Sequence, residues 1–176
     1  YQDVTDSSSY YEAVCYVTEK GLMNGTSAST FSPDAAMTRA MMVTILWRME
    51  KEPAALKSNF TDLTADWDRT AVDWAAETGV VIGVGNGKFA PNATLSLEQL
   101  ITILYRYAEN KGYNVSKSAS LDSFTDGSAV SAYAKPAMQW AVGMNFLSGN
   151  TLTPGAPASR AQIAQVLMLF CKAYIK

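Results

Sequence analysis

Two arginines stand at positions where a helix normally avoids a cation. Arg39 follows Thr38 and Arg160 follows Ser159, and each pair precedes a segment with apolar residues at helical spacing. Threonine and serine are favoured N-cap residues, so each arginine is expected at the first helical position. A cation there opposes the positive end of the helix dipole and costs about 0.3–1 kcal/mol. The placement therefore indicates a task other than helix stability.

From the residues alone, anion binding is one of two tasks open to such an arginine. A helix start presents unpaired backbone N–H groups, and a guanidinium adds a planar fork that matches a carboxylate. One charge-assisted hydrogen bond contributes about 1.5–3 kcal/mol, which exceeds the cost to the helix. A structural alternative stays open, in which the arginines join neighbouring parts of the chain by pairing with acids such as Asp3, Asp34 or Asp126. Exposed pairs of that kind contribute little stability.

The elements that must position these arginines belong to an internal repeat. The segment "FTDLTADWDRTAVDWAAETGVVIG" matches the segments that begin at residues 1 and 124. We place the repeats at 1–58, 59–116 and 117–176. Each repeat is predicted to form a helix, a loop and a second helix, so the chain is expected to be all-α.

The second helix of each repeat carries the clearer periodic signal. Its apolar residues recur at i, i+3, i+4 and i+7, which gives one apolar stripe per helix. A unit this short cannot bury its own stripe, so the three repeats are expected to form one cooperative body. The stripes are Met42, Ile45, Leu46 and Met49; Leu100, Ile103, Leu104 and Tyr107; and Ile163, Val166, Leu167 and Phe170.

The middle repeat departs from the arginine pattern. Ser96 and Gln99 keep the cap, but Leu97 replaces the arginine and Glu98 adds a negative charge. The cap residue is therefore expected to serve the fold and the arginine to serve the ligand. At most two of the three sites are predicted to bind an anion.

Composition excludes several classes of protein. The net charge of −2 argues against binding nucleic acid through the overall field of the protein. The absence of histidine from the sequence excludes Ser-His-Asp and Cys-His catalysis and the usual zinc sites. Cys15 and Cys171 are interpreted as two small apolar side chains, with a disulfide between them as the alternative. No metal or other cofactor is predicted.

The order of motifs in all three repeats resembles the S-layer homology family. The resemblance rests on "FSPDAAMTRA" with "LWRME", on "FAPNATLSLEQLITILYRYAENKGYNVS" and on "TPGAPASRAQIAQVLMLF". It implies an all-α spindle with three prongs about a pseudo-threefold axis. It also implies a central bundle of one helix per repeat, with grooves between neighbouring prongs.

The resemblance further implies a function outside catalysis. Members anchor secreted proteins non-covalently to bacterial cell walls, and their usual ligand is a secondary cell-wall polysaccharide with a pyruvyl ketal on an amino sugar. No membrane insertion is expected, because no apolar run approaches the length of a membrane span. The chain opens on "YQDV" without a visible signal peptide. We therefore expect it to be part of a larger surface protein with a further upstream domain.

The predicted carbohydrate-binding residues follow from the repeat and the resemblance. Thr38 with Arg39 and Ser159 with Arg160 carry the family motif, and Arg160 is followed at the capping-box position by Gln162. The remaining candidates have a structural alternative each. The aromatic residues Tyr16, Trp74 and Trp140 stack on sugar faces or lie in the core, and Asp3 and Asp62 accept sugar hydroxyls or cap a turn.

Arg48 and Arg106 lie nine residues after the motif position, near the negative end of the second helix, and are interpreted as structural. The competing functional hypothesis is a structural or protein-interaction module that has lost wall binding, which Leu97 favours. A glycosidase carboxylate pair is not excluded by spacing alone, but no catalytic constellation recurs, so an enzyme is not predicted.

Overall fold

The computed structural model describes residues 1–175 and contains six α-helices and one short 3-10 helix. The last residue of the third predicted repeat, Lys176, lies outside the described residues. Within those residues only isolated β-bridges occur and no strand is formed, so the all-α prediction is confirmed. The elements are α1 (Tyr11–Glu19), α2 (Arg39–Met49), α3 (Asp66–Glu77), α4 (Leu97–Asn110), η1 (Gly127–Ala129), α5 (Lys135–Gly143) and α6 (Arg160–Tyr174).

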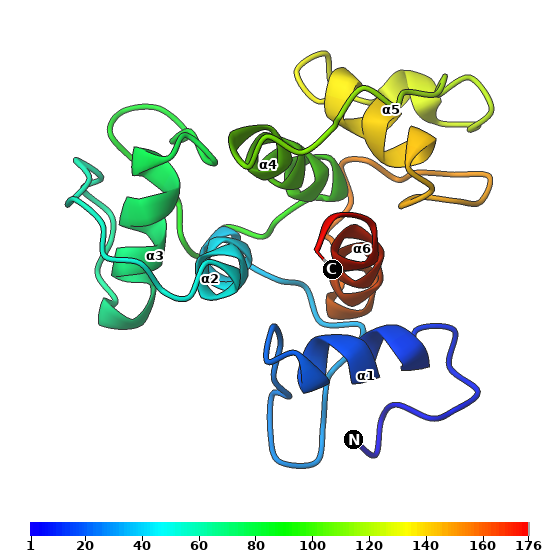
Figure 1. Ribbon diagram of the computed structural model, residues 1–176, viewed down its shortest axis with the longest axis horizontal. Helices are drawn as coiled ribbons and strands as arrows, with labels where there is room; N and C mark the ends of the chain where they lie inside the picture. Colours follow the sequence, from blue (N-terminus) through cyan, green and yellow to red (C-terminus); the bar gives the residue numbers. More distant parts are fainter. Residues whose placement is uncertain (176) are drawn as a thin grey trace.

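The helices form an inner and an outer set. Figure 1 shows α2, α4 and α6 on the inside and α1, α3 and α5 around them. Each outer helix packs on the inner helix of the preceding repeat, with α3 against α2, α5 against α4 and α1 against α6. Each inner helix therefore depends on the outer helix of a neighbouring repeat to bury its apolar stripe. The spindle shape that the resemblance implies stays a prediction.

The apolar stripes of the inner helices form the centre of the core. Every predicted stripe residue is buried except Met49, which is half-buried at the end of α2. Burial of one such side chain contributes about 1.5–3 kcal/mol, so this layer is a main source of stability. Aromatic rings complete the core beside α6, where Phe170 packs against Tyr107, Trp140 and Tyr174.

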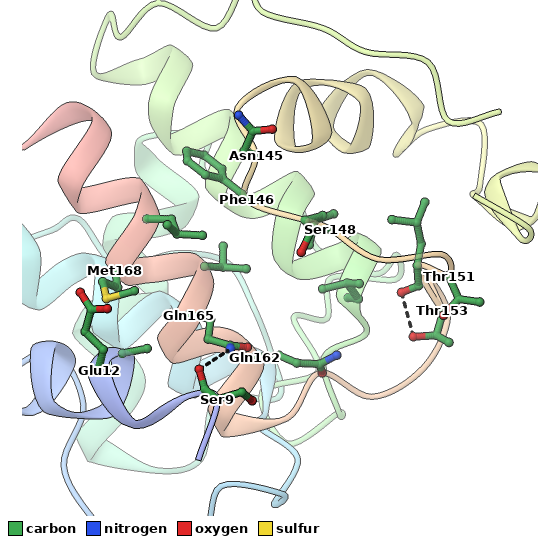
Figure 2. Close-up of a pocket in the computed structure, with 16 residues that line it drawn as sticks. Ser9, Glu12, Asn145, Phe146, Ser148, Thr151, Thr153, Gln162, Gln165 and Met168 are labelled. Carbon is green, nitrogen blue, oxygen red and sulfur yellow. Dashed lines mark hydrogen bonds between the residues drawn. The ribbon is translucent and has the colours of Figure 1, made fainter. Parts of the chain in front are cut away.

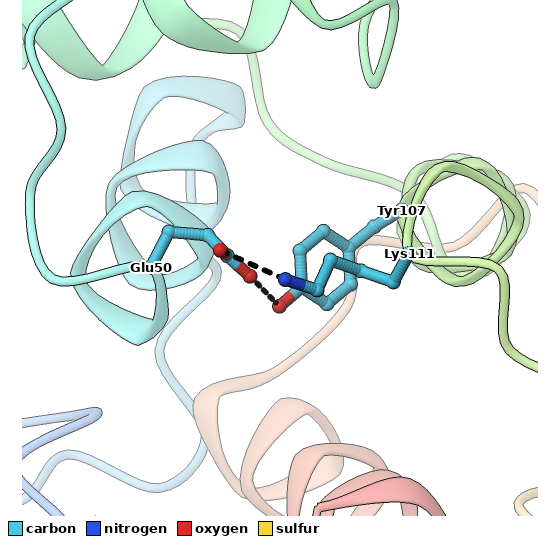
Figure 3. Close-up of polar contacts among 3 residues, drawn as sticks. All are labelled: Glu50, Tyr107 and Lys111. Carbon is cyan, nitrogen blue, oxygen red and sulfur yellow. Dashed lines mark hydrogen bonds and ion pairs between the residues drawn. The ribbon is translucent and has the colours of Figure 1, made fainter.

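A polar cluster joins the C-terminal ends of two inner helices. Figure 3 shows the Glu50 carboxylate, at the end of α2, reaching two side chains of the α4 end. It accepts a hydrogen bond of 2.6 Å from the Tyr107 hydroxyl and pairs with the Lys111 ammonium at 3.0 Å. Burial of Tyr107 and its bond to Glu50 both raise the pKa of the phenol. The hydroxyl therefore keeps its proton and holds the two helix ends together.

Candidate functional site

The N-terminal ends of the inner helices form a closed ring of backbone contacts. Arg39 N–H donates to Ala93 O at 3.0 Å, and Ala40 N–H donates to Pro91 O at 3.1 Å, both in the next repeat. The first two N–H groups of α4 and of α6 make the equivalent bonds. Leu97 and Glu98 donate to Ala156 O and Pro154 O, and Arg160 and Ala161 donate to Ala35 O and Pro33 O.

The N-cap side chains use the third N–H group of each inner helix. Thr38 accepts from Met41 N–H, while Ser96 and Ser159 accept from Gln99 and Gln162 N–H in full capping boxes. The prediction that the backbone N–H groups at the helix starts are unpaired is therefore wrong. Neighbouring loops and the N-cap side chains already accept hydrogen bonds from the first three of them. Any anion must be bound by side chains. A direct contact of Thr38 or Ser159 with a glycan stays a prediction.

The Arg39 side chain extends into the loop of the following repeat. Its Nε donates to Phe89 O at 3.0 Å and its Nη2 to Ile82 O at 3.3 Å. The guanidinium lies 4.8 Å from the centre of the Phe89 ring, and the residue is 7% exposed. The arginine thus joins two repeats through carbonyl groups and an aromatic face.

Arg160 repeats this arrangement at the junction of the last and first repeats. Its Nε donates to Phe31 O at 2.7 Å and its Nη2 to Asn24 O at 2.5 Å. The guanidinium lies 4.5 Å from the centre of the Phe31 ring, and the residue is 9% exposed. Burial lowers the pKa of both motif arginines, but a guanidinium remains charged at any ordinary pH.

Neither motif arginine forms an ion pair, although burial, which lowers the pKa of both, is opposed by the charge of Asp62 at Arg39 and of Asp3 at Arg160. Within residues 1–175 the only ion pairs are Glu50 with Lys111 and Glu12 with Lys172, so the predicted alternative pairing with acids does not occur. The Nη1 atoms of Arg39 and Arg160 have no hydrogen-bond partner among these residues, and neither is a buried unpartnered atom. Each guanidinium therefore keeps a full positive charge and one donor nitrogen open to solvent.

Each inner helix has an equivalent set of candidate residues around it, and we name each set as a site after that helix. The α2 site is a cavity of about 170 Å³ that contains Arg160, Arg48 and Trp67. The α6 site is a larger cavity of about 370 Å³, with Leu97, Leu169 and Ser9 at the equivalent repeat positions. The α4 site has Arg39, Arg106 and Tyr133 at those positions.

The α2 site contains two functional candidates that sequence reasoning missed. Arg48 was interpreted as a partner of the helix end, yet it is exposed and lines the same cavity as Arg160. Trp67 is 55% exposed and was not considered. The available signal was its position seven residues before Trp74, where the third repeat has Tyr133.

The α4 site contains the same residue types together with an acid. Burial raises the pKa of Tyr133, and Glu98 raises it further, while the positive charges of Arg39 and Arg106 oppose the shift. The Glu98 carboxylate accepts hydrogen bonds from Ser131 N–H, Ser131 Oγ and, at 3.3 Å, from Tyr133 Oη. Glu98 therefore acts at the α4 site, whereas Leu97 lines the α6 site, so the two substitutions of the middle repeat do not affect one site as predicted.

The predicted aromatic platforms lie largely inside the protein. Trp140 is 1% exposed and Trp74 is 7% exposed, so neither offers a ring face to a sugar. Trp140 packs edge-on against Phe146 and Tyr105. Tyr16 is half-buried, and burial raises the pKa of its phenol. We assign the two tryptophans to the core, which was the structural alternative.

One aspartate in each repeat clamps the loop before the inner helix by accepting hydrogen bonds from two backbone N–H groups. Both oxygens of Asp3 are occupied, because they accept hydrogen bonds from Phe31 N–H at 2.8 Å and Ser32 N–H at 2.7 Å. Asp62 makes the same pair of bonds to the second loop, and Asp126 makes it to the third. These bonds do not support a role for Asp3 and Asp62 in accepting sugar hydroxyls.

Each clamp holds a residue in the left-handed region of backbone conformation. Ser32, Ala90 and Thr153 have φ values of 57°, 58° and 48°. A residue with a side chain pays about 1–3 kcal/mol for that conformation, so it needs an external hold. The backbone bonds lower the pKa of Asp3 and Asp126. For Asp62 burial acts in the opposite direction, but the bonds from Phe89 and Ala90 exceed it, and the pKa is again lowered.

The two cysteines, possible metal ligands and possible membrane spans add no further candidate site. Cys15 and Cys171 are both free, so the disulfide alternative is wrong for this structure. Burial raises the pKa of the Cys171 thiol to about 11, which keeps it protonated. No group of three metal-ligating side chains occurs among residues 1–175, and none of the helices described is long and apolar enough to span a membrane.

Comparison with known proteins places these repeats in a family. The model of the S-layer homology domain matches residues 1–41, 59–101 and 123–164. An endoglucanase from Bacillus sp. (strain KSM-635) is 31% identical over 95% of this chain and 18% of its own length. A surface-layer 125 kDa protein from Lysinibacillus sphaericus is 30% identical over 88% of this chain and 13% of its own length.

A third relative carries its role in its name. The cellulosome-anchoring protein of Acetivibrio thermocellus is 26% identical over 65% of this chain and 27% of its own length. The chain spans less than one fifth of the endoglucanase and of the surface-layer protein. Because the three matched segments cover more than half of the sequence, the chain belongs to the S-layer homology domain family.

Proposed function

We propose that this chain anchors a larger protein to the bacterial cell surface by binding an acidic cell-wall polysaccharide, without catalysis of its own. The proposed ligand carries a pyruvyl ketal, whose carboxylate is recognised at the α2 site. The names of the relatives support the anchoring role. They include a surface-layer protein, a cellulosome-anchoring protein and an endoglucanase that matches this chain over only 18% of its own length.

The combination of charge and aromatic surface in one cavity is the observation that carries the proposal. Arg160 and Arg48 bring two cations to the α2 site, and no acid lines it. A carboxylate bound there accepts a hydrogen bond from the open Nη1 of Arg160, worth about 1.5–3 kcal/mol. The exposed face of Trp67 packs on the apolar side of the sugar ring. A cavity of about 170 Å³ suits one terminal sugar unit rather than a long segment of glycan.

The α4 site is proposed as a weaker version of the same site. It has the two arginines and the exposed ring of Tyr133, but the Glu98 carboxylate bonds to that tyrosine. An acidic ligand at this site meets like charge, which disfavours binding. We therefore expect the α2 site to be occupied first.

The test is retention of the whole chain on purified cell walls, before and after chemical removal of pyruvyl groups. Arg48→Ala and Trp67→Ala are the informative variants, because both side chains are exposed and neither makes a hydrogen bond within residues 1–175. Each is expected to reduce retention while the fold stays intact. Lys117→Ala, at an exposed loop cation outside the three sites, is the matched control. Equal retention on treated and untreated walls would exclude carboxylate recognition.

A structural or protein-interaction module is the second candidate function. The observation that favours it is that Arg39 and Arg160 both hold neighbouring loops through carbonyl groups, a role that needs no ligand. The double variant Arg39→Ala with Arg160→Ala separates the two. Unchanged wall retention by a folded double variant supports the structural role and contradicts glycan binding.

A further inference from the structure

The α6 site differs from the other two sites at three equivalent positions. Leu97 takes the place of the motif arginine, Leu169 takes the place of Arg48 and Arg106, and Ser9 takes the place of the exposed aromatic residue. All three residues line one cavity of about 370 Å³, roughly twice the volume of the cavity at the α2 site. The α6 site therefore has a larger cavity than the α2 site and has neither of its two arginines.

The charge of the α6 site excludes an acidic ligand. Glu12 is its one charged lining residue, and this carboxylate pairs with the Lys172 ammonium at 2.5 Å on the exposed rim. No arginine or lysine lines the cavity. An incoming carboxylate would lose its hydration and gain no counter-charge, which is unfavourable. Because Glu12 is already paired with Lys172, the site offers no free counter-charge to a cation either, so its chemistry favours an uncharged ligand.

Polar side chains with unused hydrogen-bonding capacity surround the cavity. Figure 2 shows Asn145, Ser148 and Thr151 on the loop after α5, opposite Gln162 and Gln165 of α6. The side chains of Asn145, Ser148 and Thr151 make no hydrogen bond within residues 1–175, and none is a buried unpartnered group. They are open to solvent and present amide and hydroxyl groups that both donate and accept.

The two glutamines of α6 differ in how much of their capacity remains. Gln162 uses only its Oε1, which accepts from Ser159 N–H at 3.0 Å, so its amide N–H₂ group stays available. Gln165 donates to Ser9 O at a long distance of 3.4 Å. A mixture of amide and hydroxyl groups without net charge is the pattern that hydroxyl and acetamido groups require.

The floor of the cavity is apolar. Leu97, Leu152 and Phe146 are 4%, 3% and 6% exposed, and they line the hollow between the polar residues. The Leu152 carbonyl, which corresponds to the acceptor of the arginine Nε in the other sites, accepts instead from Thr153 Oγ1 at 2.8 Å. The absent arginine thus leaves no unpaired carbonyl at that position. An apolar floor beneath a polar rim matches a sugar ring, which has C–H faces and polar edges.

We propose that the α6 site binds an uncharged N-acetylhexosamine unit of the wall glycan. This inference rests on the proposed function, because a saccharide is expected there only if the chain binds a glycan. The α2 site then holds the acidic sugar and the α6 site holds a neutral sugar from the same or a neighbouring glycan chain. Two sites on one chain raise the overall avidity above that of either site when one glycan or neighbouring glycans reach both.

The test is a two-dimensional NMR titration of the whole chain with N-acetylglucosamine, N-acetylmannosamine and N-acetylgalactosamine, each measured separately. At least one sugar is expected to shift the backbone amides of Asn145, Ser148 and Thr151 with a Kd of about 1–10 mM, while Arg48 is unaffected. Ser148→Trp fills the cavity from its exposed rim and is expected to weaken this binding at least tenfold. Lys117→Ala, at an exposed loop cation outside the three sites, is the matched control and is expected to leave neutral-sugar binding unchanged.

Two results would overturn the inference. One is the absence of shifts at the α6 site with all three sugars, and the other is equal binding by the folded Ser148→Trp variant. Titration of the same sample with a pyruvylated N-acetylmannosamine reports on the α2 site independently. Failure of the acidic ligand alone overturns the carboxylate proposal. Failure of the neutral sugars alone overturns only the assignment of the α6 site.

Discussion

The α2 and α6 sites have the same backbone frame and opposite surface chemistry. In both, a capped inner helix meets the neighbouring loop, and an aspartate clamps a left-handed residue in that loop. The α2 site contains Arg160, Arg48 and Trp67, whereas the α6 site has Leu97, Leu169 and Ser9 at the equivalent positions. The two sites therefore share one frame and differ in three side chains, which on the proposed function set the ligand of each site.

The comparison also separates two roles of the motif arginine. Two of its nitrogens hold the neighbouring loop, and a third is open to the cavity. In the α6 site the loop remains in place without an arginine, because Asp126 still holds it through two backbone N–H groups and Thr153 satisfies the Leu152 carbonyl. The structural role can be replaced by other groups, while the charge cannot.

Arg160→Leu makes the α2 site resemble the α6 site and is expected to have the largest effect. The loss of two charge-assisted bonds to Phe31 O and Asn24 O should lower the free energy of unfolding by about 2–4 kcal/mol. Retention on pyruvylated walls should fall by more than tenfold. Urea unfolding and a wall pull-down measure the two effects. Full retention by this variant would contradict the role of the arginine in binding.

The reverse exchange, Leu97→Arg with Leu169→Arg, is expected to create a third acid-binding site. The carbonyls of Leu152 and Ser148 stand where Arg160 finds Phe31 and Asn24 in the α2 site, so the new guanidinium has a place to bond. One added charge-assisted contact should tighten binding of the acidic glycan by about tenfold or more. Calorimetry should report one additional binding site per chain. No added site in a folded variant would show that cations alone do not define the ligand.

Trp67→Ser makes the aromatic position of the α2 site match Ser9 of the α6 site. The loss of ring contact should weaken glycan binding by about three- to tenfold, since such aromatic contacts contribute about 0.5–1.5 kcal/mol. Because Trp67 is 55% exposed, stability should change by no more than about 0.5 kcal/mol. Tyr133→Ser at the weaker α4 site is the control, and a larger effect there would reverse the proposed order of the sites.

Acidification should destabilise the aspartate-held loops of all three repeats to a similar extent. Low pH is therefore expected to distinguish the three sites less than any of the substitutions above. The folded-state pKa values of Asp3, Asp62 and Asp126 are lowered from the ordinary value of 3.8. Their contribution to stability is fully present above pH 3.8 and is lost as the pH falls through the lower folded values. Thermal unfolding between pH 2 and pH 5 measures this, and Asp126→Asn should reduce the slope.

The sequence predicted those features of the fold that depend on nearby residues. The apolar stripe of α4 follows from spacing within one helix, and Ser96 with Gln99 form the predicted capping box. The pairing of α1 with α6 involves residues from opposite ends of the chain, and no local pattern encodes it. The same limit applies to the Arg160 bonds to Phe31 and Asn24.

The candidate site was predicted in part. The motif arginines were identified correctly as unusual, but Arg48 was assigned to the helix dipole because its position on α2 gave an adequate local explanation. Trp74 and Trp140 were predicted either to stack on sugar faces or to lie in the core, and their burial assigns them to the core. Trp67 can be recognised as a candidate only from the fold, because the fold places it in the same cavity as Arg160.

The most direct test of the central claim is calorimetry of the whole chain with a pyruvylated N-acetylmannosamine and with the same sugar lacking the ketal. The account predicts that the acidic sugar binds at least tenfold more tightly to the native chain. It further predicts that Arg48→Ala removes most of this preference while Lys117→Ala preserves it. Equal affinity of the native chain for both sugars, or an undiminished preference in Arg48→Ala, would contradict the account.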